Sequence, residues 1–277
     1  MLHFICAFKS EAQPLLEHYS LKHQGDAGLF NIYLDKSQHT SLTICGMGKI
    51  SAASAVLYCH SRFPGNANDI WINLGIAGHR EREIGELLVC ERVEDAGSGK
   101  AWYPQLLVDT AIPAASLLTL DRPFDEYSEK LYDMEASGVF HAACRVSTLE
   151  FIHALKIVSD NEKNPLSRLD RNAVSQLVAE KLEDIVGYAD SLWELSRQLP
   201  ASADINEDQE KYLDAAHFTS SQQSQLLTLL QRHRVLFPGR DPCELINPGM
   251  NASNLLRNLR EHMDDAPFRL QDDKPRD

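Results

Sequence analysis

The sequence predicts a layered α/β protein in which helices pack on a central β-sheet, followed by a small C-terminal helical appendage. Two observations support this prediction. Short apolar runs typical of buried strands alternate with segments of helical periodicity through the first 199 residues, which is the pattern of an α/β sheet. Beyond residue 199 the composition becomes polar and acidic, and the strand-like runs stop.

The predicted strands are short, rich in apolar residues and bounded by turn residues. They occupy residues 2–8, 28–35, 41–46, 69–77, 85–93, 115–120 and 151–159. The predicted helices occupy residues 10–20, 49–62, 134–145 and 170–199. The last of these repeats apolar residues on one broad face, which indicates an amphipathic helix lying on the sheet.

The chain beyond residue 199 is expected to differ from the main domain, residues 1–199. We divide it into a linker (200–215), a helical appendage (216–263) and a disordered tail (264–277). The linker is polar and acidic, and the tail is highly charged. The appendage is too small to bury much core alone, so we expect it to dock on the main domain or on another subunit.

Charge and hydropathy exclude several kinds of partner. The formal net charge of −13 argues against long nucleic acid, because phosphate binding needs a basic surface. No apolar run approaches the roughly 20 residues of a membrane helix, so we expect no membrane partner. The first residues lack a basic region followed by a long apolar one, so we interpret them as a strand and not a signal peptide.

The cysteines are scattered along the chain, mostly inside apolar runs: Cys6, Cys45, Cys59, Cys90, Cys144 and Cys243. None forms a Cys-x-x-Cys pair or a Cys/His cluster with the spacing of metal ligands. We therefore expect buried, reduced thiols in a cytoplasmic protein, with no metal and no cofactor.

Polar or small residues follow three of the predicted strands. Glu11 lies in the first helical turn after the first strand, where it would also favour the helix dipole. Gly46 and Gly48 form a Gly-x-Gly turn before a helix, where backbone N–H groups can approach a ligand. A later strand ends in small residues around Ile76 and Gly78. Each of these signals alone is weak.

Two further motifs place carboxylates at element ends. Met134 and Glu135 follow Asp133 at the start of a helix. Ser159 and Asp160 close the apolar run 151–158. Such edges are where α/β proteins build their sites.

Three histidines lie near these motifs or inside apolar runs. His141 and His153 stand within apolar runs, so we expect hydrogen-bonded core residues rather than catalysts. His79 follows Gly78 and lies nearer the predicted site.

Taken in order, the five motifs resemble those of the nucleoside phosphorylase/nucleosidase superfamily. The resemblance covers residues 1–199 and is strongest to the hydrolytic branch, the methylthioadenosine/S-adenosylhomocysteine nucleosidases and futalosine hydrolases. It implies a three-layer αβα sandwich around a mixed, twisted central sheet. It also implies a homodimer that cleaves the N-glycosidic bond of a purine nucleoside, with a 5′-modified nucleoside as its small-molecule partner.

The resemblance also implies roles for individual residues. Glu11 would activate the attacking water, Glu135 would bind the ribose hydroxyls, and Asp160 would protonate purine N7. Such cleavage passes through a cationic, oxocarbenium-like sugar. The remaining substrate-binding residues implied or suggested by position are Met134, Phe124, Ser159, Gly46, Gly78 and Ile76. Met134 would pack on the sugar, and Phe124 matches a phenylalanine that stacks on the base.

Two alternatives stay open. A purine nucleoside phosphorylase would use the same pocket, but that branch usually carries an arginine in the loop after the first strand. Here the loop reads Lys9-Ser10-Glu11, which favours hydrolysis. A nucleoside-binding or scaffold protein of reduced activity is the other alternative, in which residues 216–263 would serve a partner.

Overall fold

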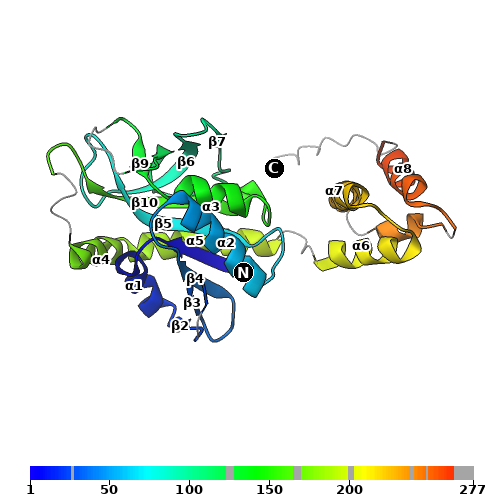
Figure 1. The fold of residues 1–277 in the computed structure, drawn as a ribbon, viewed down its shortest axis with the longest axis horizontal. Helices are drawn as coiled ribbons and strands as arrows, with labels where there is room; N and C mark the ends of the chain where they lie inside the picture. Colours follow the sequence, from blue (N-terminus) through cyan, green and yellow to red (C-terminus); the bar gives the residue numbers. More distant parts are fainter. Residues whose placement is uncertain are drawn as a thin grey trace, which may run out of the picture. The chain divides into compact units, whose positions relative to one another are not determined.

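The chain divides into two compact units, residues 1–199 and residues 200–277. The structure, a computed structural model, describes residues 1–25, 28–122, 128–164, 170–198, 203–237, 240–247 and 249–264 (Figure 1). Each unit has its own buried core, so each is described by itself.

A mixed β-sheet forms the centre of the first unit. Its strands over the described residues are β1 (Leu2–Cys6), β2 (Lys22–His23), β3 (Asn31–Leu34), β4 (Thr40–Ile44), β5 (Ile70–Gly78), β6 (Leu87–Asp95), β7 (Ala101–Trp102), β8 (Ala114–Thr119), β9 (Leu131–Asp133) and β10 (Ile152–Asp160). Four neighbouring strands, β4, β1, β5 and β10, run parallel. Their carboxyl ends therefore meet at one edge of the sheet.

Part of the sheet closes on itself. β10 pairs with β5 on one side and with β6 on the other, and β8 and β9 continue from β6. β9 returns to β5 through a single residue pair, Tyr132 opposite Gly78. The closure brings Tyr132 to the carboxyl end of β5, next to the predicted site.

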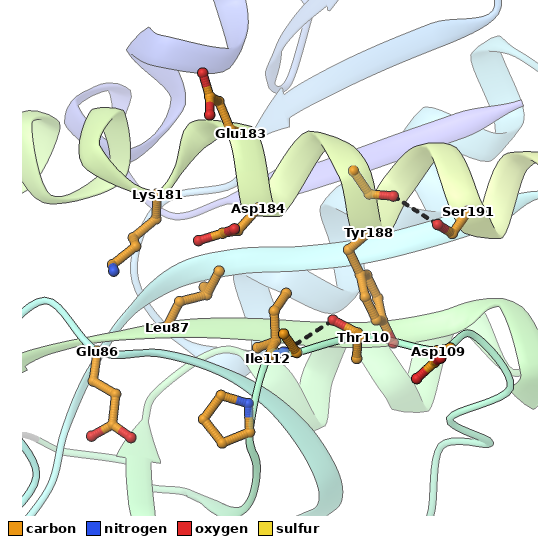
Figure 2. A pocket seen from close by; sticks show the side chains of 13 residues that line it. Glu86, Leu87, Asp109, Thr110, Ile112, Lys181, Glu183, Asp184, Tyr188 and Ser191 are labelled. Atoms are coloured by element: carbon orange, nitrogen blue, oxygen red, sulfur yellow. Dashed lines mark hydrogen bonds between the residues drawn. The ribbon is translucent and has the colours of Figure 1, made fainter.

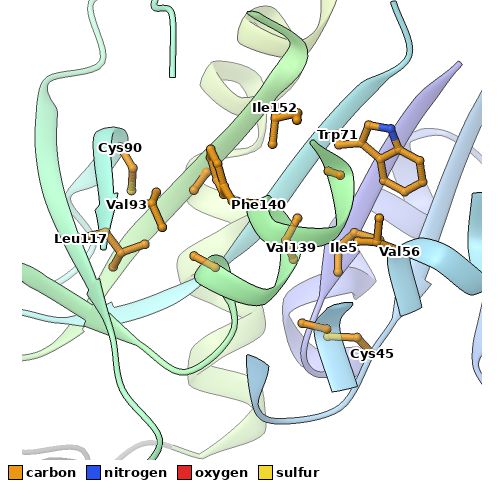
Figure 3. Packing of buried hydrophobic residues seen from close by; sticks show 14 of the residues in the cluster. Ile5, Cys45, Val56, Trp71, Cys90, Val93, Leu117, Val139, Phe140 and Ile152 are labelled. Atoms are coloured by element: carbon orange, nitrogen blue, oxygen red, sulfur yellow. The ribbon is translucent and has the colours of Figure 1, made fainter. Parts of the chain in front are cut away.

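Helices cover both faces of the sheet. Helices α1 (Lys9–His18), α4 (Arg171–Glu180) and α5 (Leu182–Gln198) pack in one core cluster, and α2 (Lys49–Arg62) and α3 (Ala136–Ala143) pack in the other. Alternation along the strands supplies both clusters, since Phe4 and Ile72 belong to the first and Ile5 and Trp71 to the second (Figure 3). The predicted three-layer αβα sandwich is confirmed.

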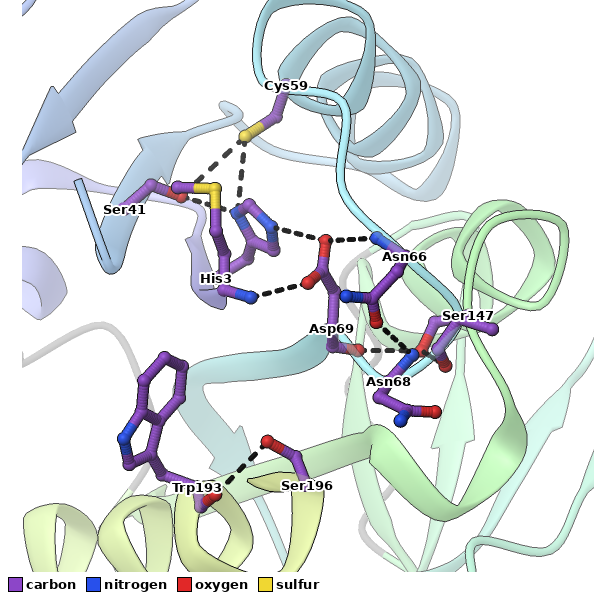
Figure 4. A network of polar contacts seen from close by, with 11 residues as sticks. His3, Ser41, Cys59, Asn66, Asn68, Asp69, Ser147, Trp193 and Ser196 are labelled. Carbon is purple, nitrogen blue, oxygen red and sulfur yellow. Dashed lines mark hydrogen bonds and ion pairs between the residues drawn. The ribbon is translucent and has the colours of Figure 1, made fainter. Parts of the chain in front are cut away.

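A buried polar network lies at the amino ends of the parallel strands, opposite the predicted site. The His3 ring stacks on Trp71 with ring centroids 4.0 Å apart, and its Nδ1 lies 2.7 Å from Ser41 Oγ (Figure 4). Asp69 Oδ2 lies 3.6 Å from His3 Nε2, and the other Asp69 oxygen accepts a hydrogen bond from the Met1 amino group. These contacts satisfy polar groups that would otherwise be costly to bury.

The second unit is helical. It comprises α6 (Ala203–Ala215), α7 (Ser220–Leu236), the short 3₁₀ helix η3 (Pro242–Leu245) and α8 (Ala252–Asp264). Its core contains Tyr212, Phe218, Leu226, Leu229, Leu230, Ala252, Leu255, Leu256, Leu259 and Met263. In this part of the chain, α7 and α8 lie within the range predicted for the helical appendage, except for the last residue of α8.

The prediction of a linker over residues 200–215 needs correction, because α6 fills most of that range. Tyr212 is fully buried and donates a 2.8 Å hydrogen bond to the Pro242 carbonyl. Asp208 is also buried and is paired with Arg234 at 2.6 Å. The acidic composition concealed a helix that buries Tyr212 and Asp208. The predicted tail falls, from residue 265 onward, outside the described residues.

Smaller differences concern short or broken elements. β2, β7 and β9 are two or three residues long and were not predicted. The single helix expected over residues 170–199 is two helices, because the chain turns at Lys181 between α4 and α5. Among the described residues, none of the helices combines the length and the apolar character needed to span a membrane.

Candidate active site

Glu11 is held rigidly at the carboxyl end of β1. It lies in the first turn of α1, where one oxygen accepts a 2.8 Å hydrogen bond from the Phe8 backbone N–H. Its other oxygen accepts a 3.1 Å hydrogen bond from the N–H of Ile76 on β5. Burial raises the pKa of Glu11, although these N–H groups and the nearby Lys156 ammonium act in the opposite direction. Glu11 is thus a buried carboxyl group fixed between two strand ends.

Glu135 meets the Gly-x-Gly turn that follows β4. Its Oε1 accepts a 2.7 Å hydrogen bond from the backbone N–H of Gly48. Gly46 and Gly48 have φ angles of 76° and 100°, a region that side chains with a Cβ rarely enter, so glycine is required to aim this N–H. Met134, which precedes Glu135 in the sequence, is half-buried. Glu135 therefore contacts the Gly46–Gly48 turn through Gly48.

The pKa of Glu135 is raised to about 7. Burial is the main cause, and the negative charges of Asp133 and Glu11 add to it, while Lys156 and the Gly48 N–H oppose it. Glu135 can therefore exchange a proton near neutral pH, which an exposed glutamate does not do.

A buried lysine joins these carboxylates. Lys156 Nζ lies 2.8 Å from Asp133 Oδ2, and both side chains are 1% exposed. Asp133 also accepts a 2.7 Å hydrogen bond from the Thr119 hydroxyl and a 2.8 Å bond from the Ala136 N–H. A Cβ added at Gly75 would lie 2.9 Å from Glu11 Oε1 and 3.5 Å from Lys156 Nζ, so both side chains approach that glycine.

Sequence reasoning missed Lys156. The apolar run 151–158 predicts a buried strand, and its single lysine was not given a role. A signal was present, since a lysine is almost never fully buried without a partner. Glu11, Asp133, Glu135 and Lys156 form what we call the carboxylate–lysine cluster.

Asp160 and Ser159 close β10 at the same edge of the sheet. Ser159 Oγ donates a 2.6 Å hydrogen bond to Asp160 Oδ1. The hydroxyl of Tyr132 lies 3.5 Å from Asp160 Oδ2, and Gly78 is the strand partner of both Asp160 and Tyr132. The end of β5 therefore links Glu11 with Asp160, because the Ile76 N–H donates a hydrogen bond to Glu11 and Gly78 is the strand partner of Asp160.

The structure brings together most of the predicted site residues. Glu11, Gly46, Ile76, Gly78, Ser159 and Asp160 lie at or near the carboxyl ends of β1, β4, β5 and β10, whereas Met134 and Glu135 follow β9, from which Glu135 reaches Gly48. Phe124 lies outside the described residues.

The histidines near the site have structural roles. His79 Nδ1 accepts hydrogen bonds from the N–H groups of Glu81 and Arg82, and Nε2 lies 3.0 Å from the Glu129 carbonyl. Both ring nitrogens thus order a loop. His153 is buried and hydrogen-bonded, as predicted. His141 was expected in the core but is exposed, because α3 directs Phe140 and Ala142 inward and His141 outward.

Two of the hollows among the described residues bear on the position of the site. One of about 420 Å³ is bounded by the start of β6, residues 109–113 and α5, and Tyr188 and Asp184 are among its lining residues (Figure 2). None of the predicted site residues lines it. The other, of about 510 Å³, opens beside Gly48 and is lined by Phe30, Met47, Ile50, Leu120 and polar neighbours that include Lys49 and Asp121.

The cysteines and acidic groups of the described chain offer one candidate set of metal ligands, in the second unit. Ligand atoms of Asp208, Asp241 and Cys243 lie within 4.8 Å of one another. Asp208 is already paired with Arg234. Burial and the two carboxylates raise the pKa of the Cys243 thiol to about 12, which disfavours the thiolate that binds metals. The donor set does not fit a metal. Four of the six cysteines are buried as expected, whereas Cys144 is exposed and Cys243 half-buried.

The fold of residues 1–199 is shared with solved nucleosidases and with a futalosine hydrolase, which agrees with the fold that the motifs implied. The chain is similar to the 5′-methylthioadenosine/S-adenosylhomocysteine nucleosidase from S. pneumoniae, solved with a transition-state inhibitor: identity is 14%, the TM-score is 0.54, and the match covers 69% of this chain and 99% of that chain. It is also similar to futalosine hydrolase from Helicobacter pylori, with 14% identity, a TM-score of 0.53 and coverage of 67% and 97%.

A plant enzyme gives a comparable match. The apo 5′-methylthioadenosine nucleosidase of Arabidopsis thaliana has 16% identity and a TM-score of 0.55, with 72% of this chain and 96% of that chain covered. Comparisons with protein-family models and with curated proteins give no match. At these identities the similarity establishes the fold, and the chemistry is argued from the residues.

Proposed function

We propose that this protein is an N-ribosyl hydrolase that cleaves the glycosidic bond of a purine nucleoside. The observation that carries the proposal is the position of three buried carboxyl groups. Glu11 and Asp160 lie at the carboxyl ends of two parallel strands, and Glu135 reaches the turn that follows a third. Hydrolysis at a cationic sugar needs a base for water, a holder for the ribose hydroxyls and an acid for the departing base. The nucleosidases of the same fold act on such bonds.

Glu11 is the proposed base. Its two backbone hydrogen bonds fix its position, and burial makes it a better proton acceptor than an exposed glutamate. Glu135 is proposed to accept hydrogen bonds from the ribose hydroxyls, with its Oε1 held by Gly48 and Met134 packing on the sugar. Asp160 is proposed to protonate purine N7, supported by Ser159. Ile76, Gly46 and Gly78 contribute the backbone that lines the pocket, and Phe124 is proposed to stack on the base.

Hydrolysis is favoured over phosphorolysis by the charges near the site. Phosphate binding needs available cations. Lys156 is the buried cation among the described cluster residues, and it is paired with Asp133. Lys9, in the loop after β1, is exposed. The described part of the site therefore suits water, rather than phosphate, as the attacking nucleophile.

The hollow beside Gly48 supports the proposal that the substrate is a 5′-modified nucleoside. It adjoins the N–H that holds Glu135 and is lined partly by apolar side chains, among them Phe30, Met47 and Ile50. A ribose held by Glu135 could extend a 5′ substituent of moderate size into this space.

A homodimer and a cytoplasmic location belong to the same proposal. Ile50 and Leu57 are 80% and 43% exposed on one side of α2, and Met47 and Leu29 are 58% and 81% exposed. We expect a second copy of the chain to pack on these exposed apolar residues. Six unpaired cysteines suit a reducing compartment.

The test is release of base from a panel of purine nucleosides, with and without phosphate. We expect free ribose as the product, and a fall in kcat of about 10²-fold or more in Glu11→Gln, Glu135→Gln and Asp160→Asn. Glu17→Gln on the exposed side of α1 is the matched control and should retain full activity. Phosphate-dependent formation of ribose 1-phosphate would identify a phosphorylase. A wild type that binds these nucleosides but releases no base from any of them would favour the binding-protein alternative.

A further inference from the structure

Tyr132 is built into the edge of the site beside Asp160. Its ring crosses the end of β5 at Gly78, where an added Cβ would lie 2.2 Å from the Tyr132 Cζ and 2.3 Å from its hydroxyl oxygen. Only glycine at position 78 leaves room for this ring. The hydroxyl ends 3.5 Å from Asp160 Oδ2.

The two oxygens of Asp160 differ in their surroundings. Oδ1 accepts the short 2.6 Å hydrogen bond from Ser159, whereas Oδ2 has the tyrosine hydroxyl at the long limit of hydrogen bonding. A proton that Asp160 transfers to a base therefore resides on Oδ2, because Oδ1 is occupied as an acceptor. The hydroxyl of Tyr132 stands next to the oxygen from which the proton leaves.

In a bound purine, the group nearest to this hydroxyl besides N7 would be the substituent at position 6. N7 and the substituent at position 6 lie on the same side of a purine, so a group beside the acid that meets N7 also stands near the 6-substituent. A 6-amino group donates a hydrogen bond and a 6-oxo group accepts one. A tyrosine hydroxyl can do either, whereas a carboxylate oxygen can only accept.

We propose that Tyr132 recognises the 6-substituent of the base and allows the site to accept 6-oxopurines as well as 6-aminopurines. This inference rests on the proposed binding of a purine next to Asp160. Without the tyrosine O–H, a 6-oxo group would face acceptor oxygens and lose its hydrogen-bond donor. A buried acceptor left without a donor is discriminated against strongly. A 6-amino group would keep an acceptor, because Asp160 Oδ1 has a second lone pair besides the one that faces the Ser159 hydroxyl.

Tyr132→Phe tests the inference, because it removes the hydroxyl and keeps the ring over Gly78. Binding of free hypoxanthine and free adenine is measured by calorimetry, and cleavage is measured with inosine and adenosine carrying the same 5′ group. We expect hypoxanthine binding to weaken about tenfold or more and adenine binding to change less than about threefold. Tyr103→Phe is the matched control, since that ring is 55% exposed in a loop.

Retained adenine binding reports that the variant is folded. Equal weakening of both bases, or no weakening of either, overturns the role of Tyr132, as does a wild type that binds neither base. If wild type binds both bases and Tyr132→Phe weakens only hypoxanthine binding, recognition by Tyr132 is supported even when wild type cleaves neither nucleoside. That outcome rejects hydrolysis alone. The two proposals therefore fail separately.

Discussion

Lys156 and Asp133 form an ion pair that is closed off from solvent, with Nζ 2.8 Å from Oδ2 and each side chain 1% exposed. Burial lowers the pKa of Lys156, but Asp133, Glu135 and Glu11 outweigh it and raise the pKa above its usual range. The lysine is therefore charged, and it offsets part of the negative charge of the cluster. Its removal leaves three carboxyl groups without a cation.

Lys156→Met should consequently destabilise the fold by about 3–5 kcal/mol at pH 7, the usual cost of leaving a buried charge unpaired. Asp133→Asn should cost less, because Glu11 and Glu135 remain to compensate Lys156. The free energy of unfolding in urea measures both effects. Lys130→Met is the control, since Lys130 pairs with Glu94 at 2.9 Å but is 37% exposed, and its loss should cost less than about 1 kcal/mol. Equal costs for Lys156→Met and Lys130→Met would contradict the argument.

Glu135→Gln should make the protein more stable at alkaline pH while reducing activity. A glutamate in an unfolded chain has a pKa of about 4.3, and in the fold the pKa of Glu135 is raised to about 7. The folded state thus binds this proton more tightly, so stability is lost as pH rises from about 4 to 7. At pH 8 the ionised side chain costs roughly 3–4 kcal/mol. The glutamine variant avoids that cost because it carries no charge.

Unfolding in urea at pH 5 and pH 8 measures this difference. The gain from Glu135→Gln should be large at pH 8 and small at pH 5, and Glu17→Gln on the surface of α1 should show no such contrast. A Glu135→Gln protein no more stable than wild type at pH 8 would show that the buried charge is already compensated. A gain in stability with a loss of kcat is the trade-off expected of a catalytic group.

The sequence predicted the parts of the site that follow strands and missed those that depend on closure of the sheet. Glu11 and Gly48 stand at strand-to-helix transitions, which periodicity and glycine spacing reveal. Tyr132 lies on a three-residue strand that pairs with β5 at one position, and no local pattern specifies so short a strand. The partner of Lys156 comes from the same strand, 23 positions earlier in sequence, so tertiary contact alone identifies it.

The neutral state of His153 should make stability depend on pH in acid. Tyr188 contacts Nδ1 at 2.9 Å, Nε2 lies 2.9 Å from the Glu150 carbonyl, and burial lowers the pKa of His153 to about 4. An unfolded histidine has a pKa of about 6.5, so the unfolded chain binds the proton first. Stability should fall by about 3 kcal/mol as pH decreases from 6.5 to 4.

His153→Gln should remove this component of the pH dependence, as measured by unfolding at several pH values between 4 and 7. Its stability at pH 7 should be lower than that of wild type, because the contact with Tyr188 is altered. His18→Gln, at an exposed position on α1, should keep the wild-type slope. If stability falls with decreasing pH as steeply in His153→Gln as in wild type, other groups cause the loss of stability in acid.

Gly138→Ala should separate α2 from α3 and thereby disturb the site. A Cβ at Gly138 would lie 1.9 Å from the carbonyl oxygen and 2.6 Å from the carbonyl carbon of Lys49, so the two helix backbones must move apart. Lys49 follows Gly48, whose N–H holds Glu135, and the shift should lower kcat as well as stability. We expect a loss of about 1–3 kcal/mol from overpacking at a backbone contact.

Gly187→Ala is the matched helical control, because nothing lies within 4 Å of an added Cβ there. Alanine is the better helix former, so this variant should be more stable than wild type by roughly 0.5–1 kcal/mol and equally active. Thermal unfolding and base release measured on both variants decide the point. If Gly138→Ala keeps the stability and kcat of wild type, the close approach of α2 and α3 does not position Glu135, and the Gly48 contact must be maintained by the β4–α2 turn alone.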